Sequence, residues 1–304
     1  MGLLGALPSR FRRERILIVG CGDVGLRALR QLSGKSRVLA TTSQPDKRAL
    51  LRTAGCTPLV ANLDHPVELR RLAGVAHRVL HLAPPPGDAG KGWHTDPRTR
   101  ALTRALAQRT PPKVVVYGST SGVYGDCGGD WVDETRALAP QTPRALRRVD
   151  AEQAVRTFGK QTQVPWVILR IPGIYALDRE GGTPVERLRK GTPVLEAQDD
   201  VYTNHIHADD LARACALALW RGARRRCVQV CDDTELKMGD YFDLAADLYG
   251  LPRPPRLPRS TANAQLPVVL LSFMSESRRL RNERMKAELG LVLSYPTVRE
   301  GLMA

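Results

Sequence analysis

The chain has 304 residues, of which 42% are hydrophobic and 25% are charged. These values are typical of a globular protein with room for one large α/β unit and a smaller lobe, and they exclude a disulfide-stapled miniprotein. No run approaches the roughly 18 apolar residues of a membrane-spanning helix, so we expect no membrane partner. A short apolar start is followed by Arg10, Arg12 and Arg13, the reverse of a secretory signal, so we expect a cytoplasmic protein.

The net charge of +15 comes from 46 basic and 31 acidic residues. Phosphate contacts dominate nucleic-acid binding, but the arginines are spread along the chain without a basic arm or interleaved aromatic residues. We therefore expect an arginine-rich solvated surface and a site for a small anionic ligand, and we do not expect a nucleic-acid partner. The six cysteines show no C-x-x-C pair and no zinc-finger spacing with histidines, so we expect reduced thiols and no metal.

In the first half of the chain, short apolar runs alternate with segments of helical periodicity, as in βαβ units around a parallel sheet. The predicted strands cover residues 16–19, 37–41, 57–61, 78–82, 113–118 and 166–170. The predicted helices cover residues 26–32, 46–54, 65–72, 97–109 and 142–158.

After residue 171 the alternation weakens, apart from a strand and a helix near residues 201–219. The pattern predicts an α/β fold with a doubly wound parallel sheet and a smaller C-terminal α/β lobe. We assign residues 1–170 to a dinucleotide-binding domain, rejoined by about 201–220, and residues 171–304 to a smaller substrate-binding lobe.

A G-x-G-x-x-G motif follows the first predicted strand directly and opens the first helix. The first glycine allows a tight turn, the second lets backbone N–H groups approach a pyrophosphate, and the third lets helix and strand pack closely. The helix N-terminus adds a partial positive charge. The motif predicts a dinucleotide site, with a plain glycine turn as the alternative. Its residues are Gly20, Gly22, Asp23, Val24 and Gly25.

The end of the second strand bears on the choice of cofactor. It carries Thr41 and Thr42, and no Asp or Glu occurs between residues 24 and 45. An NAD site commonly has a carboxylate here, which accepts hydrogen bonds from the ribose hydroxyl. Hydroxyl groups tolerate a 2′-phosphate and Lys47 attracts it, so the sequence favours NADP over NAD.

Further motifs carry a family resemblance. They are Y-G-S-T-S-G-V-Y-G at 117–125, L-R-I-P-G-I-Y at 169–175, N-H-I-H-A-D-D at 204–210, R-N at 281–282, L-G at 289–290 and Y-P-T at 295–297. With the glycine motif they cover about residues 16–302, and the chain resembles an extended short-chain dehydrogenase/reductase of the NAD-dependent epimerase/dehydratase group.

The resemblance implies a Rossmann fold, an oxidoreductase or epimerase activity, and a homodimer built on the helices near 97–109 and 142–158. It implies further cofactor contacts at Asn62, Leu63, Ala83, Pro84, Arg148 and Pro172. It implies substrate contacts at Gly173 and Ile174.

The chain departs from this family at the proton-transfer residues. In the family a Ser or Thr after the fifth strand orients a substrate oxygen, and a Tyr-x-x-x-Lys pair moves the proton, because a nearby cation stabilises the phenolate. Counting back from Glu152 places Arg144 at the Tyr position and Arg148 at the Lys position. Arg148 can keep a cationic role, but the Arg144 guanidinium holds its proton and cannot replace a phenol.

Arg144 and Arg148 lie one helical turn apart. We interpret them as a clamp for a substrate carboxylate or phosphate, since arginine forks grip such groups bidentately. The alternative is a solvated basic face on which Arg148 pairs with Glu152.

If proton transfer occurs, another group must carry it. Tyr124 is our first candidate for both proton transfer and substrate contact, with a packing aromatic as the alternative. The candidates for orienting the substrate oxygen are Ser119, Thr120 and Ser121. The remaining acid–base candidates are Asp126, Asp133 and Glu134.

His207 invites a catalytic assignment, but it precedes Asp209 and Asp210 at the start of a predicted helix. We expect these carboxylates to cap that helix and to interact with its dipole.

Two functions remain open from the sequence. The first is an NADP-linked oxidoreductase or epimerase that acts on an anionic small molecule through a non-standard acid–base group. The second is a cofactor-binding sensor or scaffold that has lost its chemistry, as the missing Tyr-x-x-x-Lys pair suggests.

Overall fold

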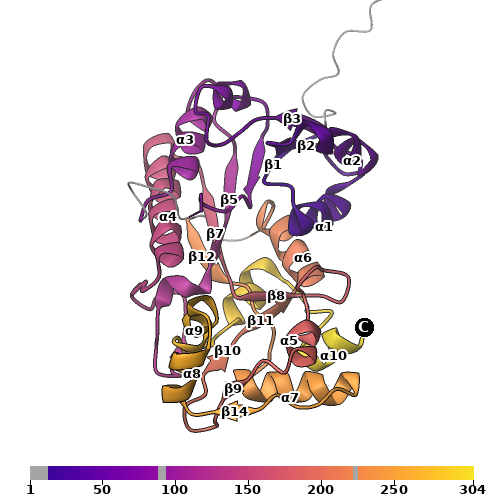
Figure 1. Ribbon diagram of the computed structural model, residues 1–304. Helices are drawn as coiled ribbons and strands as arrows, with labels where there is room; N and C mark the ends of the chain where they lie inside the picture. Colours follow the sequence, from indigo (N-terminus) through magenta and orange to yellow (C-terminus); the bar gives the residue numbers. More distant parts are fainter. Residues whose placement is uncertain (1–12, 88–93, 222–224) are drawn as a thin grey trace, which may run out of the picture.

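The computed structural model describes residues 13–87, 94–221 and 225–304, so Arg10 and Arg12 lie outside the described residues. A parallel sheet with the strand order β12-β7-β5-β4-β1-β2-β3 forms its centre (Figure 1). The strands are β1 (Arg15–Val19), β2 (Arg37–Thr42), β3 (Thr57–Val60), β4 (Arg78–His81), β5 (Val114–Thr120), β7 (Trp166–Ile171) and β12 (Arg226–Gln229). All six predicted strands are present, and the doubly wound Rossmann-type fold is confirmed.

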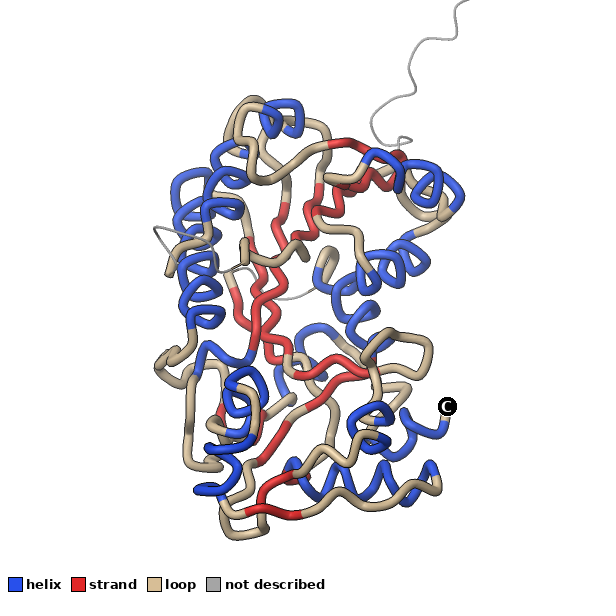
Figure 2. The backbone as a smooth tube through the Cα atoms, in the orientation of Figure 1, coloured by secondary structure: helices blue, strands red, loops and turns tan. Residues whose placement is uncertain are grey.

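Helices cover both faces of this sheet (Figure 2). On one face α1 (Asp23–Leu32) packs against α6 (Ala208–Ala218), and on the other α3 (Pro97–Leu106) packs against α4 (Pro143–Thr162). Alternate residues of β1 supply the two cores: Ile16 and Ile18 face the α1 and α6 side, whereas Leu17 and Val19 face the α3 and α4 side. This alternation is what a parallel strand buried on both faces requires.

Two predicted helices differ in detail from the structure. The segment 46–54 forms a short 3₁₀ turn, η2 (Pro45–Lys47), followed by α2 (Arg48–Thr53). The segment 65–72 forms only a 3₁₀ turn, η3 (Glu68–Leu72), with Leu69 and Leu72 buried in the core. α1 begins earlier than predicted, at Asp23 directly after the glycine turn.

The C-terminal lobe is built from short strand pairs and helices around its own core. Its parallel pairs are β8 (Gly173–Tyr175) with β11 (His205–His207), and β9 (Val194–Leu195) with β14 (Arg256–Leu257). β10 (Tyr202–Thr203) pairs antiparallel with β13 (Leu236–Lys237). Its helices are α5 (Val185–Arg189), α7 (Met238–Tyr249), α8 (Arg259–Gln265), α9 (Val268–Met274) and α10 (Val298–Met303).

The later chain also returns to the central sheet. β12 pairs with β7 at the sheet edge, and β15 (Arg279–Leu280) pairs with β6 (Trp131–Val132) beside the loop after β5. A π-helical turn, η5 (Met285–Leu289), packs against α6. These returns bring Ser277 and Arg278 against the loop after β5, where they donate to Asp126 and Gly125.

Within the described part of the chain, no helix combines the length and the apolar character that crossing a membrane requires.

Candidate functional site

The glycine loop has the geometry of a phosphate cradle. Gly20 has a φ of +85°, and a Cβ there would lie 2.4 Å from the backbone nitrogen of Ala83, so only glycine fits. A Cβ on Gly25 would lie 3.2 Å from the Gly20 carbonyl oxygen, which explains the close approach of α1 to β1. A Cβ on Gly22 would meet no atom within 4 Å, so the space above the N-terminus of α1 is open. The residues present therefore fit a bound diphosphate.

Residues at the end of β2 divide into two groups. Thr41 is buried, and its Oγ1 accepts a hydrogen bond from the Gly20 N–H at 3.3 Å, so this side chain supports the glycine loop. That contact argues against the predicted contact of the Thr41 hydroxyl with a 2′-phosphate. Thr42 is half-buried and its Oγ1 caps the turn at Gln44, while Lys47 is exposed.

The other predicted cofactor contacts follow the carboxyl ends of β3 and β4. The Asn62 side chain accepts from the Asp64 N–H at 3.0 Å, and Leu63 packs against the core under α3. Ala83 is buried beneath Gly20, and the Pro84 carbonyl accepts from Arg98. These positions lie at the carboxyl ends of the sheet strands, as the glycine loop does.

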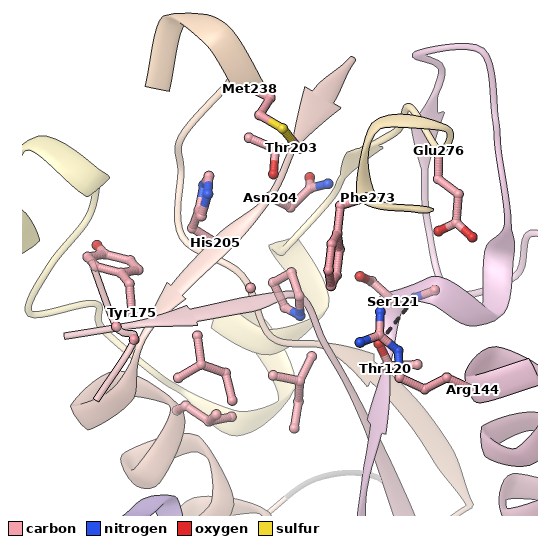
Figure 3. Close-up of a pocket in the computed structure, with 18 of the residues that line it drawn as sticks. Thr120, Ser121, Arg144, Tyr175, Thr203, Asn204, His205, Met238, Phe273 and Glu276 are labelled. Atoms are coloured by element: carbon pink, nitrogen blue, oxygen red, sulfur yellow. Dashed lines mark hydrogen bonds between the residues drawn. The ribbon is translucent and has the colours of Figure 1, made fainter. Parts of the chain in front are cut away.

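A cleft of about 630 Å³ lies between the carboxyl ends of the sheet strands and the C-terminal lobe. It brings together many of the predicted residues, namely Val24, Ser119, Thr120, Ser121, Arg144, Arg148, Pro172, Gly173 and Ile174. In Figure 3, Thr120, Ser121 and Arg144 lie on one side, with Glu276 above them. Tyr175, His205 and Met238 lie on the other side, with Phe273 between the two groups.

The three hydroxyls after β5 have different surroundings. Ser119 donates to the Glu152 carboxylate at 2.7 Å, so its hydroxyl is already committed to a buried acceptor. Thr120 Oγ1 accepts from the Gly122 N–H at 3.3 Å and still faces the cleft (Figure 3). Ser121 also lines the cleft. Thr120 and Ser121 are therefore better placed than Ser119 to meet a ligand.

The two arginines of α4 both line the cleft. Arg148 donates from Nη1 to the Tyr117 hydroxyl at 3.0 Å and to the Gly118 carbonyl at 2.8 Å, which fixes it against β5. Arg144 stacks on the Phe273 ring, with the guanidinium carbon 4.9 Å from the centroid. Burial lowers the Arg144 pKa, and the nearby Glu276 carboxylate opposes that shift. The alternative pairing of Arg148 with Glu152 is wrong, because Glu152 pairs with Arg170.

Tyr124 does not lie in the cleft. Its side chain is buried, and its hydroxyl accepts from Arg170 at 2.8 Å and from Gln229 at 2.7 Å. Burial raises the pKa of the phenol to about 12. This position argues against the predicted role in proton transfer and substrate contact, because the hydroxyl is enclosed by two structural donors.

The acidic candidates on the loop after β5 also accept hydrogen bonds from groups outside the cleft. Asp126 accepts from the Ser277 N–H at 2.8 Å, and Asp133 accepts from Thr135. Glu134 accepts from the Gln229 N–H at 2.9 Å. None of these three side chains is among the described residues that line the cleft.

The helix start at residues 207–210 also differs from expectation. The N-cap of α6 is His207, whose Nδ1 accepts from the Asp209 N–H at 3.2 Å. The carboxylates bind other partners: Asp209 pairs with Arg27 at 2.6 Å, and Asp210 accepts from the Ser294 and Tyr295 N–H groups. Asp209 and Asp210 therefore bond to groups on α1 and on the C-terminal segment, and His207 caps the helix in their place.

The C-terminal lobe contributes cleft residues that the sequence analysis missed. Five arginines line the cleft, and Glu276 is the one carboxylate among the described residues that do so. Glu276 pairs with Arg278 at 2.8 Å, and Arg179 pairs with Asp23 beside the glycine loop. The charge of the cleft is therefore strongly positive, as an anionic ligand requires.

His205 lines the same cleft from β11 and stacks on Tyr241, with the ring centroids 4.3 Å apart. Burial lowers its pKa to about 4, so the imidazole is neutral near pH 7. His205 thus contributes a neutral ring to the cleft wall.

Comparisons with known proteins give a consistent picture of the fold. A conserved protein of unknown function from Silicibacter pomeroyi DSS is 30% identical, with a TM-score of 0.77 and coverage of 95% of this chain and 96% of that chain. UDP-glucose 4-epimerase from Thermotoga maritima, solved with UDP-glucose, is 17% identical, with a TM-score of 0.75 and the same coverage. UDP-glucuronic acid 4-epimerase from Bacillus cereus, solved with NAD, is also 17% identical, with a TM-score of 0.75 and the same coverage.

Among curated protein sequences, none matches this chain. The model of the NAD dependent epimerase/dehydratase family matches residues 16–231, from β1 to the end of the central sheet. The matched region contains the glycine loop, the β5 hydroxyls and both cleft arginines of α4. The chain therefore belongs to the NAD-dependent epimerase/dehydratase family.

Proposed function

We propose that this protein binds a nicotinamide dinucleotide at the glycine loop and acts on an anionic small molecule as an oxidoreductase or epimerase. The observation that carries the proposal is one cleft that runs from Val24 on α1 to Arg144 and Arg148 on α4. Family membership and the open cradle at Gly22 support the dinucleotide. When bound, such a cofactor accepts or donates a hydride.

The residues of the cleft have different roles in the proposed reaction. Thr120 and Ser121 orient a substrate oxygen, and Arg148 holds the end of β5 in place through Gly118. Arg144 binds an anionic group of the substrate, because its guanidinium lies over Phe273 and no carboxylate in the described chain bonds to it directly. Relatives in the same fold have been solved with UDP-glucose or UDP-glucuronic acid, which are anionic.

NADP is the preferred cofactor in this proposal. Lys47 is exposed just beyond β2, and no carboxylate occurs between residues 24 and 45 to repel a 2′-phosphate. Titrations of the protein with NADPH and NADH, followed by nicotinamide fluorescence, test the preference. Tighter binding of NADH would overturn it, and Lys47→Ala should weaken NADPH more than NADH.

A screen of anionic hydroxy and keto compounds tests the activity, with nicotinamide absorbance at 340 nm as the readout. We expect turnover with at least one anionic compound and a loss of turnover in Arg144→Met, with dinucleotide affinity retained. An equal rate in wild type and Arg144→Met would contradict the proposed clamp. Failure to bind either dinucleotide would end the proposal as a whole.

A binding protein without turnover is the second candidate function. The specific observation in its favour is that α4 presents two arginines to the cleft, neither of which can take up a proton. Tyr124, the first alternative, is enclosed by Arg170 and Gln229. Dinucleotide binding without turnover across the screen, together with altered association of a protein partner, would select this function.

The homodimer on α3 and α4 stays part of the proposal. A groove lined by Arg100, Arg104 and Asp150 runs between these helices. Light scattering of the purified chain measures the mass directly, and a monomer at micromolar concentration would contradict the dimer.

A further inference from the structure

Arg187 is unusual among the arginines of the cleft. It lies on α5 and stacks on Phe242 of α7, with the guanidinium carbon 4.2 Å from the ring centroid. Its Nε and Nη2 atoms are buried and have no hydrogen-bond partner among the described residues. Burial lowers its pKa, and Tyr241 opposes this shift.

Three other arginines of the cleft have oxygen partners, whereas Arg144, like Arg187, stacks on an aromatic ring. Arg179 pairs with Asp23, Arg278 pairs with Glu276, and Arg148 donates to two oxygens at the end of β5. Burying guanidinium N–H groups is unfavourable unless something completes their hydrogen bonds. The site that surrounds Arg187 is therefore incomplete without an acceptor.

Arg187 as a whole is half-buried and lines the cleft together with Tyr241 and Phe242, so an acceptor bound in the cleft can approach its guanidinium. These residues belong to the α5 and α7 wall, whereas Arg144 stacks on Phe273 next to the β5 hydroxyls. Figure 3 shows Met238, from the first turn of α7, on the side of the cleft opposite Arg144. The two arginines thus face different ends of one cavity.

We propose that Arg187 binds a second anionic group of the substrate, a carboxylate or a phosphate, at the α5 and α7 end of the cleft. The inference rests on the proposed function and narrows it. The substrate carries one anionic group near Thr120 and Arg144, and another that accepts hydrogen bonds from the Arg187 fork. The guanidinium lies over the Phe242 ring, which restricts its movement before an anion binds.

The test uses full-length protein, with inorganic phosphate and succinate as separate probes at constant ionic strength. Thermal unfolding is followed for wild type, Arg187→Met and Arg189→Met. Arg189 is exposed on the same short helix and serves as the matched control. We expect Arg187→Met to bind the effective probe about tenfold more weakly than wild type, as loss of a charge-assisted contact implies. Arg189→Met should behave as wild type, and a response to one probe alone distinguishes phosphate from carboxylate.

Two further readouts separate this site from the rest of the cleft. Without probe, Arg187→Met should be at least as stable as wild type, because it removes an unpaired buried cation. Its affinity for NADPH should equal that of the wild type. If the wild type binds no dinucleotide, that result contradicts the proposed function and is distinct from the result of the probe experiment at Arg187. Equal probe responses in wild type and Arg187→Met, or no response in either, would overturn the proposal.

Discussion

Glu152 on α4 and Arg170 on β7 form an ion pair at 2.9 Å, and their side chains are 1% and 2% exposed. Ser119 donates to the same carboxylate at 2.7 Å, and Arg170 also donates to the Tyr124 hydroxyl at 2.8 Å. The pair therefore ties α4 to the sheet directly beneath the cleft. Because Glu152 binds Arg170, it does not pair with Arg148, which lies one helical turn earlier on α4.

The first prediction concerns the stability that depends on this pair. Glu152→Ala leaves the Arg170 guanidinium buried without its main partner, and we expect a loss of about 3–5 kcal/mol in the free energy of unfolding. The double substitution Glu152→Leu with Arg170→Met removes both charges and should recover most of that loss. Urea denaturation measures both values, and equal stabilities of the single and double variants would contradict the explanation.

The second prediction separates the roles of two glycines in the loop. Gly22 has a φ of −86° and open space around it, so Gly22→Ala should leave the stability of the protein unchanged. The added methyl group occupies the cradle, so dinucleotide affinity should fall about tenfold or more, which corresponds to about 1.4 kcal/mol.

Gly20→Ala is the matched control for that variant. Its φ is +85° and its Cβ would lie 2.4 Å from the Ala83 nitrogen, so it should lose stability by about 1–3 kcal/mol or more. Calorimetric unfolding and nicotinamide fluorescence measure the two effects separately. Unchanged dinucleotide affinity in folded Gly22→Ala would show that no diphosphate binds at this loop.

Sequence patterns could predict the sheet because its strands are buried on both faces and form continuous apolar runs. β12 was missed, since the segment Arg226–Gln229 has only two apolar residues and sits at the sheet edge. The C-terminal lobe gave little signal because its strands β9, β10, β13 and β14 are two residues long and show no periodicity.

The site was predictable where its residues are local in sequence. The glycine loop combines a turn, a close contact and a helix start within six residues, so spacing alone indicates it. The surroundings of Tyr124 depend on Arg170 and Gln229, which lie 46 and 105 residues away in the chain. No local pattern indicates which way such a side chain points. The same holds for Arg187, whose aromatic partner Phe242 lies on a different helix.

The third prediction concerns the charge beside the glycine loop. Asp23, the first residue of α1, pairs with Arg27 and Arg179, so two cations neutralise a carboxylate next to the proposed diphosphate site. Arg179→Met removes one of them, and we expect weaker dinucleotide binding with little change in stability, because the pair is partly exposed. Adding Asp23→Asn should restore much of the affinity by removing the repulsion. Fluorescence titration of the single and double variants gives the coupling, and independent effects would exclude this explanation.

The fourth prediction is a pH dependence of stability that depends on Asp232. This residue is 4% exposed, and burial raises its carboxyl pKa to about 7. Its Oδ1 accepts from the Thr234 N–H at 3.0 Å, and its Oδ2 has no hydrogen-bond partner in the described structure. Because the ordinary Asp pKa is about 3.9, the folded state binds a proton between about pH 4 and pH 7 that the unfolded state does not.

The contribution of Asp232 to stability is therefore fully present below about pH 4 and is lost as the pH rises through about 7. Asp232→Asn keeps the acceptor for Thr234 and removes the charge, so its stability relative to wild type should increase from pH 4 to pH 8. The buried His205, with its pKa lowered to about 4, acts in the opposite direction as the pH falls, but it is common to both proteins and cancels in the difference. Urea denaturation of both proteins at pH 5, 6, 7 and 8 measures this difference. If the difference in stability between the two proteins stays constant across the series, Asp232 does not titrate near pH 7 and the prediction is wrong.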